Sequence, residues 1–366
     1  MSIAADPLLA PLPADRPAVE RVARIPAGFA AAGATAGIKA SGRPDLALVV
    51  AEGASVPAAA VFTPNLFAAA PVRLSRANLQ ATGGSEAAAG YAKAVIATSG
   101  SANAATGPAG DDDQAAIGEA VASALGTTPD RVLHLSTGVI GTRLPVDNVT
   151  AAVRHVAATG LAANDEALHA AAVSLCTTDS TTKAATVTVT APGAAGGTVE
   201  INVTGIAKGV GMIHPRMATM LSILLTDATA APGTLRDILR AAAATTWDQL
   251  SVDGDTSTND TVFLLASGAA GAAPADTNPA ARAALAVAVE AVARDLARQQ
   301  ARDGEGATAL ITCQVSGAAD DADARAIARA VISSSLVKAA VHGRDANWGR
   351  IAGAAGNAVV AEAAIL

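Results

Sequence analysis

The chain has 366 residues, of which 51% are hydrophobic and 16% are charged, and its formal net charge is −7. This length fits two domains or one large α/β domain, and the apolar fraction is large enough for a buried core. With an acidic balance and only 4 Phe, 2 Trp and 1 Tyr, the chain lacks the basic patches and stacking side chains that nucleic-acid binding needs. We therefore expect no nucleic-acid partner.

The sequence also argues against a membrane protein and against a cysteine-built site. The longest uncharged stretch, residues 53–72, contains three prolines and draws its apolarity largely from alanine, so it does not predict a membrane span. The N-terminus has no basic segment followed by an apolar core, which argues against a signal peptide. Cys176 and Cys313 are far apart and support neither a disulfide framework nor a zinc site. We expect a cytoplasmic protein without a metal.

The first half of the chain alternates expected strands with expected helices. Apolar runs predict strands at residues 46–50, 58–62, 93–97 and 132–135. Helices are expected at residues 111–125, 151–158 and 166–175. Three aspartates in the first turn of the first helix suit the helix dipole.

The second half opens with a strand pattern. Residues 185–191 alternate with period two, and a Gly-Gly turn leads to a hairpin partner at 198–203. Further strands are expected at 221–225, 261–266 and 310–315, helices at 235–247, 280–301 and 322–332, and a last strand or strand–helix junction at 336–341. Together these elements predict an α/β or α+β fold in which helices cover layered sheets.

A constrained loop leads into one of the expected strands. Residues 208–220 contain Gly209 and Gly211, which free the backbone, and Pro215, which restricts it. The hydroxyl residue Thr219 follows, just before the apolar strand. On spacing alone this segment favours an ordinary connection into a strand, with a catalytic hydroxyl as the alternative.

Three other segments combine polar side chains with small residues. Thr137-Gly138 follows an expected strand and brings a hydroxyl near a backbone N–H. This pair can be an ordinary turn or can bind an oxyanion. Residues 253–261 carry three aspartates, but Leu264 stands where a calcium loop needs a bidentate acid, so they predict a hydrogen-bonded loop that shapes a pocket. Glu305 lies between two glycines, placed either to approach a ligand or to follow a helix end.

These segments, in their order along the chain, resemble the ornithine acetyltransferase family, the bifunctional glutamate N-acetyltransferases of arginine biosynthesis. The resemblance extends over almost the whole chain. Its most specific blocks are Gly211–Pro215, Met217–Leu221, Asp253–Thr261, Glu305–Thr308 and Asn347–Arg350.

The resemblance implies a layered α/β fold with an N-terminal threonine nucleophile, shared with self-processing aminopeptidases. It also implies that the precursor cleaves itself between Ala218 and Thr219, which leaves an N-terminal segment 1–218 and a C-terminal segment 219–366. Thr219 then carries both the nucleophilic hydroxyl and a free α-amine that can act as its base.

The resemblance further implies a reaction. Acetyl would pass from N-acetylornithine to Thr219 and then to glutamate, with acetyl-CoA as an optional second donor and without a bound cofactor or metal. The cleaved chains would assemble as α2β2. The implied site residues are Thr137 and Gly138 for the oxyanion hole and Lys208, Glu305 and either Thr177 or Thr178 for the amino-acid substrate.

Two alternatives to this reaction stay open, and two departures from the family pattern motivate the second of them. Thr98 and Ser101 stand where the family has asparagines, and the family's Glu-Asn-Ser-rich tail is not part of this sequence. One alternative is a related self-processing aminopeptidase or amidase, which would pass the acyl group to water. The other is an uncleaved, inactive homologue that binds amino acids. Lys208 and Glu305, as a clamp for a zwitterion, favour the transferase.

Overall fold

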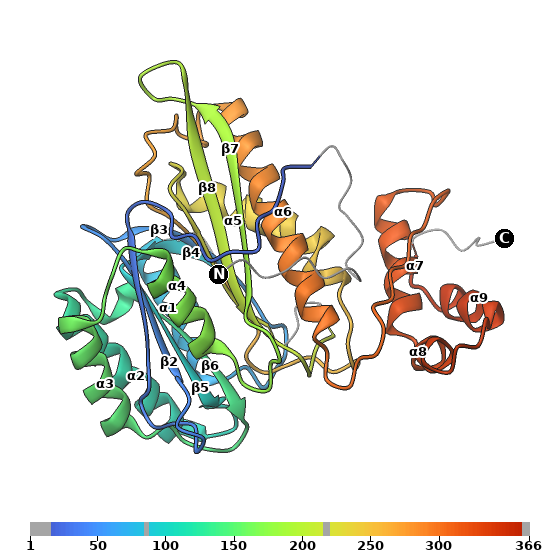
Figure 1. Ribbon diagram of the computed structural model, residues 1–366, viewed down its shortest axis with the longest axis horizontal. Coiled ribbons are helices and arrows are strands. Elements are labelled where there is room, and N and C mark those ends of the chain that lie inside the picture. The colour runs from blue at the N-terminus through green and yellow to red at the C-terminus, as the bar shows by residue number, and fades with distance from the viewer. Residues whose placement is uncertain (1–15, 84–87, 215–219, 361–366) are drawn as a thin grey trace.

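The computed structural model describes residues 16–83, 88–214 and 220–360. The expected nucleophile Thr219 and the cleavage-site residue Ala218 lie outside these described residues. Within them, the strands form two sheets packed on each other, with helices on both outer sides (Figure 1). The fold class predicted from the sequence, layered sheets covered by helices, is confirmed.

The first sheet is built from strands in the N-terminal half of the chain. Its strand order is β1 (Phe29–Ala34), β2 (Leu46–Ala51), β5 (Ala94–Ser101) and β6 (Val132–Val139). β5 and β6 are parallel, and the other neighbours are antiparallel. Alternate residues of β2, namely Leu46, Leu48 and Val50, belong to a core shared with the outer helices α2 (Gly107–Leu125) and α3 (Val146–Thr159).

The second sheet is larger and carries the helices of the C-terminal half. Its strand order is β4 (Ala89–Ala92), β3 (Val56–Phe62), β10 (Thr261–Ala266), β9 (Leu221–Thr226), β8 (Thr198–Lys208) and β7 (Lys183–Pro192). β9 and β10 are parallel and fully buried, which explains their uninterrupted apolar sequences. Helices α5 (Pro232–Thr245) and α6 (Pro279–Arg302) cover the outer face of this sheet (Figure 1).

The inner faces of the two sheets share one apolar core. Leu133 and Leu135 of β6 lie in the same buried cluster as Ile223 and Leu225 of β9. Helix α4 (Asp165–Leu175) contributes to this layer and packs on β1 and β2, while α1 (Ala70–Gly83) packs on β4 and β6. Strands that belong to different sheets therefore end close to one another at the border of this core.

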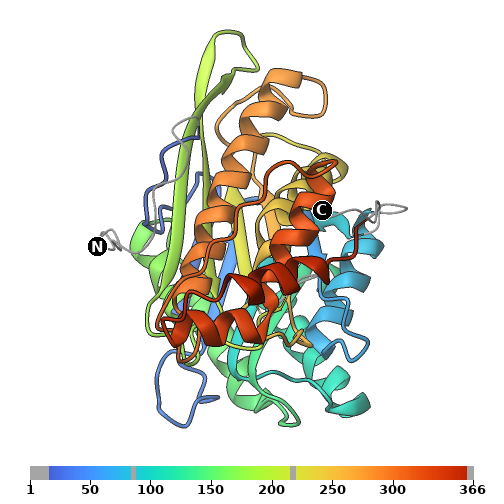
Figure 2. The same ribbon diagram turned by 90° about the vertical axis from the view of Figure 1, so that its right-hand side faces the viewer.

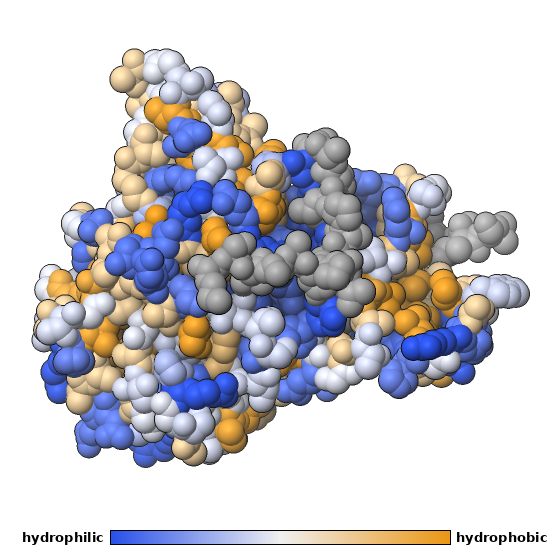
Figure 3. Space-filling view, in the orientation of Figure 1, coloured by the Kyte–Doolittle hydropathy of each residue, from blue (hydrophilic) through white to orange (hydrophobic). Residues whose placement is uncertain are grey.

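A small helical group follows α6. It contains α7 (Asp321–Ser333), α8 (Ser335–His342) and α9 (Trp348–Gly356), and it projects to one side of the sheets (Figures 1 and 2). The Arg329 guanidinium joins it to the main body by donating to the carbonyl oxygen of Asp248, in the short 3₁₀ turn Trp247–Gln249. Figure 3 shows apolar side chains gathered on this group, where Leu336, Trp348 and Ile351 are exposed. None of the described helices combines the length and apolarity needed to cross a membrane.

Two predictions near the C-terminus are wrong. Residues 310–315 do not form a strand, because they run from α6 to α7 without a neighbouring described strand to pair with. Residues 336–341 lie in the helix α8, whose N-terminus is capped by Ser334 through a bond from the Val337 N–H. The apolar periodicity of that short segment fits a helix face, since Val337 and Ala340 are the buried positions.

Candidate active site

Two of the expected site residues meet where strands of different sheets end. Thr137 lies near the end of β6, and Lys208 is the last residue of β8. The Lys208 ammonium donates a hydrogen bond to Thr137 Oγ1 at 3.1 Å, and both side chains are buried. Gln300 of α6 supports this lysine from behind, because its Nε2 donates to the Lys208 carbonyl at 2.8 Å while its Oε1 accepts from Trp247.

Gly138 occupies a position that only glycine fits. Its φ is +131°, and a Cβ at this position would lie 2.3 Å from the carbonyl carbon of Gly100, its partner on β5. Gly138 is exposed while Thr137 beside it is buried, so the chain passes from core to surface between them. The backbone N–H of Gly138 and the hydroxyl of Thr137 therefore lie at the rim of the buried layer.

The polar segment 253–260 is hydrogen-bonded, as the sequence predicts, and it holds two chain segments. Asp253 accepts hydrogen bonds from the backbone N–H groups of Met212 and Ile213, the second at 2.9 Å. Thr256 donates to the carbonyl oxygen of His214. Met212 has φ +56°, an unusual backbone conformation for a side chain of this size. The loop thus fixes the chain up to His214.

Asn259 and Asp260 fix the neighbouring strand ends. Asn259 Nδ2 donates to the carbonyl oxygens of Ala102 and Ser136, at 2.7 and 2.9 Å, and so ties down the residue before Thr137. Asp260 Oδ1 accepts from the Met220 N–H at 3.0 Å, at the start of β9. Sequence reasoning described this segment only as a pocket-shaping loop; its run of small polar residues directly before a buried strand was the available signal.

Asp260 is a buried carboxyl with an unusual environment. It is fully buried, and its Oδ2 has no hydrogen-bond partner among the residues that the structure describes. Burial raises the pKa of Asp260 well above its usual range, although the Met220 N–H, Ser257 and Lys208 oppose the rise. This carboxyl, with its raised pKa, accepts from the backbone N–H of Met220, the residue before β9.

Thr178 and Glu305, from the loops after α4 and α6, meet at the surface. Thr178 Oγ1 donates to Glu305 Oε1 at 2.8 Å, and the Glu305 N–H donates to the carbonyl oxygen of Val210. A Cβ on Gly211 would lie 3.0 Å from Glu305 Oε2, so the carboxylate rests directly against that glycine. Glu305 is exposed and has no cationic partner among the described residues, which leaves it available to an ammonium group.

A buried ion cluster that sequence reasoning missed lies beneath these residues. The Lys183 ammonium contacts Asp179 Oδ1 at 2.7 Å and Asp303 Oδ2 at 2.6 Å. Burial alone would raise the pKa of Asp179, but Lys208, Lys183 and the Gly209 N–H outweigh it and lower this pKa to about 2. Burial lowers the pKa of Lys208, and Asp179 opposes that change. Only the pairing of residues far apart in sequence reveals this cluster.

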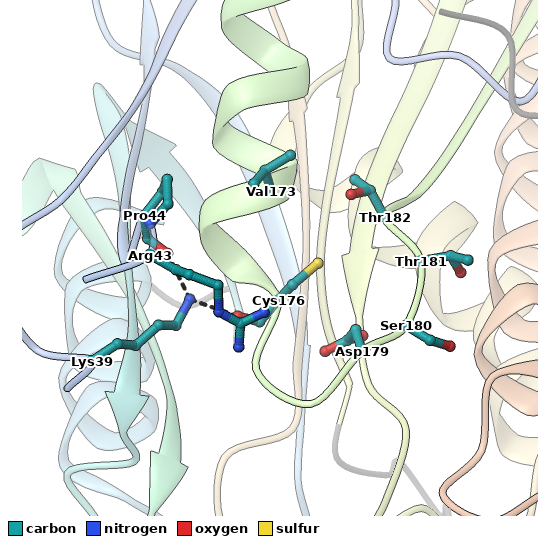
Figure 4. A pocket seen from close by; sticks show the side chains of 9 residues that line it. All are labelled: Lys39, Arg43, Pro44, Val173, Cys176, Asp179, Ser180, Thr181 and Thr182. Atoms are coloured by element: carbon teal, nitrogen blue, oxygen red, sulfur yellow. Dashed lines mark hydrogen bonds between the residues drawn. The ribbon is translucent and has the colours of Figure 1, made fainter. Parts of the chain in front are cut away.

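A pocket of about 140 Å³ lies against the loop that carries Thr177 and Thr178. Lys39 and Arg43 extend into it from the segment between β1 and β2 (Figure 4). Lys39 Nζ donates to the carbonyl oxygens of Pro44 and Cys176, and Arg43 Nη2 donates to that of Thr177. The pocket is also lined by Asp179 and the hydroxyl residues that follow it, up to Thr182. These contacts hold the loop in place.

Within the described part of the chain, no group of three His, Cys, Asp or Glu side chains is arranged to hold a metal ion. The side chain of the buried His134 contacts Gln114, whose Nε2 lies 3.0 Å from His134 Nδ1. Burial lowers the pKa of His134 to about 3, so this imidazole is neutral.

Sequence comparisons with known proteins point to one family. The chain matches the ArgJ family over residues 30–365. It is 46% identical over 334 residues to the arginine biosynthesis bifunctional protein ArgJ of Thermosynechococcus vestitus, which covers 91% of this chain and 76% of that protein. The protein of the same description from Mycobacterium tuberculosis strain H37Rv is 46% identical over 343 residues, or 92% and 78% of the two chains. A solved ornithine acetyltransferase from the same species, in complex with ornithine, is 42% identical over 53% of this chain and 95% of its own, with a TM-score of 0.45.

Proposed function

The chain belongs to the ArgJ family, and on that premise we propose that it transfers acetyl from N-acetylornithine to glutamate in arginine biosynthesis, with acetyl-CoA as a second donor. In this proposal the chain first cleaves itself between Ala218 and Thr219. Residues 1–218 and 219–366 then remain together, and two such pairs assemble as α2β2. Thr219 carries the acetyl group between donor and acceptor.

One observation carries the assignment of the site. Residues from four separate segments form two polar pairs, Lys208 with Thr137 and Thr178 with Glu305, at 3.1 and 2.8 Å. The buried ammonium suits the α-carboxylate of an amino acid. The Glu305 carboxylate, which has no cationic partner among the described residues, suits an ammonium group of the ligand. A site with both charges suits a substrate that carries both, and N-acetylornithine has an α-carboxylate and a δ-ammonium group.

The proposed cleavage is an acyl shift. Thr219 Oγ attacks the carbonyl carbon of Ala218, the peptide C–N bond breaks, and the proton of the hydroxyl passes to the released amine. Water then hydrolyses the ester, which leaves the Ala218 carboxylate and a free Thr219. Support comes from the residues on both sides of the cleavage site, because Asp253 accepts from the Met212 and Ile213 N–H groups and Asp260 accepts from the Met220 N–H.

In the proposed transfer, the Thr219 α-amine takes the proton of Oγ as Oγ attacks the acetyl carbonyl. Thr137 Oγ–H and the Gly138 N–H stabilise the oxyanion. Because Thr137 Oγ1 already accepts from Lys208, its own proton remains available for that role. Collapse releases the ornithine amine, which receives the proton from the Thr219 ammonium. The glutamate ammonium first loses a proton to solvent, and the neutral amine then attacks the ester carbon. The bond between that carbon and Thr219 Oγ breaks, and a proton of the attacking amine passes through the Thr219 α-amine to Oγ.

The reaction is tested with N-acetylornithine labelled in its acetyl group. We expect labelled N-acetylglutamate and free ornithine in equal amounts when glutamate is present. Without glutamate, we expect ornithine release to stop at one equivalent per site. Continuous release of labelled acetate in the absence of glutamate would contradict the transferase and identify a hydrolase. Absence of both products would contradict catalysis of either kind.

A loop variant tests the proposed role of the strand start in cleavage. In Asp260→Ala, the buried Met220 N–H loses its acceptor, at a cost of about 1–3 kcal/mol. We expect self-cleavage to slow by about tenfold, measured as the fraction of intact chain over time after synthesis. Asp255→Ala is the control, since Asp255 is exposed in the same loop. Equal cleavage rates in both folded variants would contradict this role.

A further inference from the structure

A buried lysine outside the proposed set of substrate-binding residues joins the segments that carry them. Lys183 begins β7, and its side chain is fully buried. Its ammonium contacts Asp179, in the loop after α4, and Asp303, in the loop after α6. These loops also carry Thr178 and Glu305, each within two residues of an aspartate of the cluster.

Each aspartate also accepts hydrogen bonds from groups other than Lys183. Asp179 accepts from the Gly209 N–H at 2.9 Å and from the Thr177 N–H at 3.0 Å. It therefore connects the loop between α4 and β7, residues 176–182 (the substrate loop), to the residue after Lys208. Asp303 accepts from the Ser180 N–H at 3.1 Å and from the Ser180 hydroxyl. It therefore connects the Glu305 loop to the substrate loop.

The buried charges of this region balance. Lys183 and Lys208 supply two positive charges, and Asp179 and Asp303 supply two negative ones, all four side chains being almost or completely buried. Removal of Lys183 would leave two carboxylates near one ammonium, and uncompensated buried charge is a strong disturbance. The loops that carry Thr178 and Glu305 would then separate, or Lys208 would be drawn toward Asp179 and away from Thr137.

We propose that Lys183, through Asp179 and Asp303, is a positioning residue that sets the spacing between the Lys208 end and the Glu305 end of the substrate clamp. This inference rests on the proposed function for the identity of the substrate, but the geometry concerns the binding of any amino acid that spans the clamp. Lys183 is expected to affect substrate binding more than the acetyl-transfer step, because no described contact joins it to Thr137 or Gly138.

The test compares Lys183→Met with Asp303→Asn and with the double variant. Calorimetry gives the Kd of ornithine, and steady-state assays give kcat and KM for N-acetylornithine. We expect Lys183→Met to raise Kd and KM by about 10- to 100-fold, because breaking a buried ion cluster is costly and shifts the loops that hold the substrate, with a much smaller change in kcat. The double variant restores charge balance, so its Kd and KM are expected to lie closer to those of the wild type.

Arg21→Met is the matched control. Arg21 makes a bidentate contact with the largely buried Asp295, at 2.9 and 3.1 Å, and it has no part in the clamp. We expect its Kd and KM to stay within about twofold of the wild type. If Lys183→Met does not fold, Asp303→Asn alone carries the test, with the same expected rise in Kd and KM.

Three outcomes would overturn the inference. They are a folded Lys183→Met with unchanged Kd and KM, a double variant no better than Lys183→Met, and, where Lys183→Met does not fold, an Asp303→Asn variant with unchanged Kd. Failure of the proposed function has a different signature. A wild-type protein that binds ornithine but transfers no acetyl would contradict the reaction, while the Kd values would still test Lys183.

Discussion

A Gly138→Ala variant is expected to lose acetyl transfer by a factor of about 10²–10³, the usual effect of removing one oxyanion donor. The added Cβ would lie 2.3 Å from the Gly100 carbonyl carbon and 2.4 Å from its oxygen, both of which are backbone atoms. They cannot rotate away as a side chain could, so the ends of β5 and β6 must separate. The Gly138 N–H then leaves the position next to Thr137 Oγ1. The measurement is kcat/KM for N-acetylornithine with glutamate.

The control for this variant is Gly141→Ala. Gly141 also has a positive φ, +85°, but nothing lies within 4 Å of the position that its Cβ would take. The control therefore carries the backbone strain without the collision, and its kcat/KM is expected to fall only a few-fold. Equal losses in two folded variants would show that strain alone explains the effect, and full activity in Gly138→Ala would contradict the oxyanion role.

Lys208→Met is expected to weaken substrate binding by about 2–5 kcal/mol, the usual result of removing one partner from a buried charged contact. The variant removes the donor to Thr137 Oγ1 and leaves the negative charge of Asp179 with less compensation. The loss should appear mainly in KM for N-acetylornithine and in the Kd of ornithine. Because the Thr137 hydroxyl also loses its fixed orientation, kcat is expected to fall as well.

Lys93→Met is the matched control for Lys208→Met. Lys93 is partly buried in the turn between β4 and β5, and its Nζ donates to backbone carbonyl oxygens, including that of Gly53 at 2.7 Å. Burial lowers the pKa of both lysines. We expect the control to bind ornithine as the wild type does. Equal Kd values for the two variants would contradict the role of Lys208 in the clamp.

The charge of Lys208 also makes the binding of ornithine depend on pH. Burial lowers the pKa of Lys208 below its ordinary value, and Asp179 opposes only part of that change. The charged ammonium is the form that attracts a carboxylate. Binding of ornithine is therefore expected to weaken as the pH rises through this lowered pKa. In Lys208→Met only the alkaline weakening caused by deprotonation of ornithine itself should remain.

Much of the fold follows from local sequence patterns. The apolar runs at 46–50, 221–225 and 261–266 predict strands because burial on both faces demands continuous apolar sequence, and β2, β9 and β10 confirm them. The pattern at 310–315 is similar, but a strand also needs a partner, and the local sequence does not reveal whether one is present. The pairing order of the two sheets also depends on contacts between distant residues.

Part of the candidate site can be predicted from the sequence and part cannot. The family resemblance, which the match to the ArgJ family confirms, implies Thr137, Lys208 and Glu305 as site residues. The Lys183 cluster could not be anticipated, because 120 residues separate Lys183 from Asp303 and nothing in the local pattern links them. In the sequence, Asp260 is one of several polar residues before a strand. Its complete burial, which distinguishes it from the others, follows only from the fold.

The most direct test of the account is the denaturing mass spectrum of the protein after mixing with N-acetylornithine and then with glutamate. The account predicts two segments that divide before Thr219, with one acetyl group on segment 219–366, located on Thr219 by fragmentation and lost when glutamate is added. A single intact chain, or two segments that never gain an acetyl group while N-acetylglutamate forms, would contradict it.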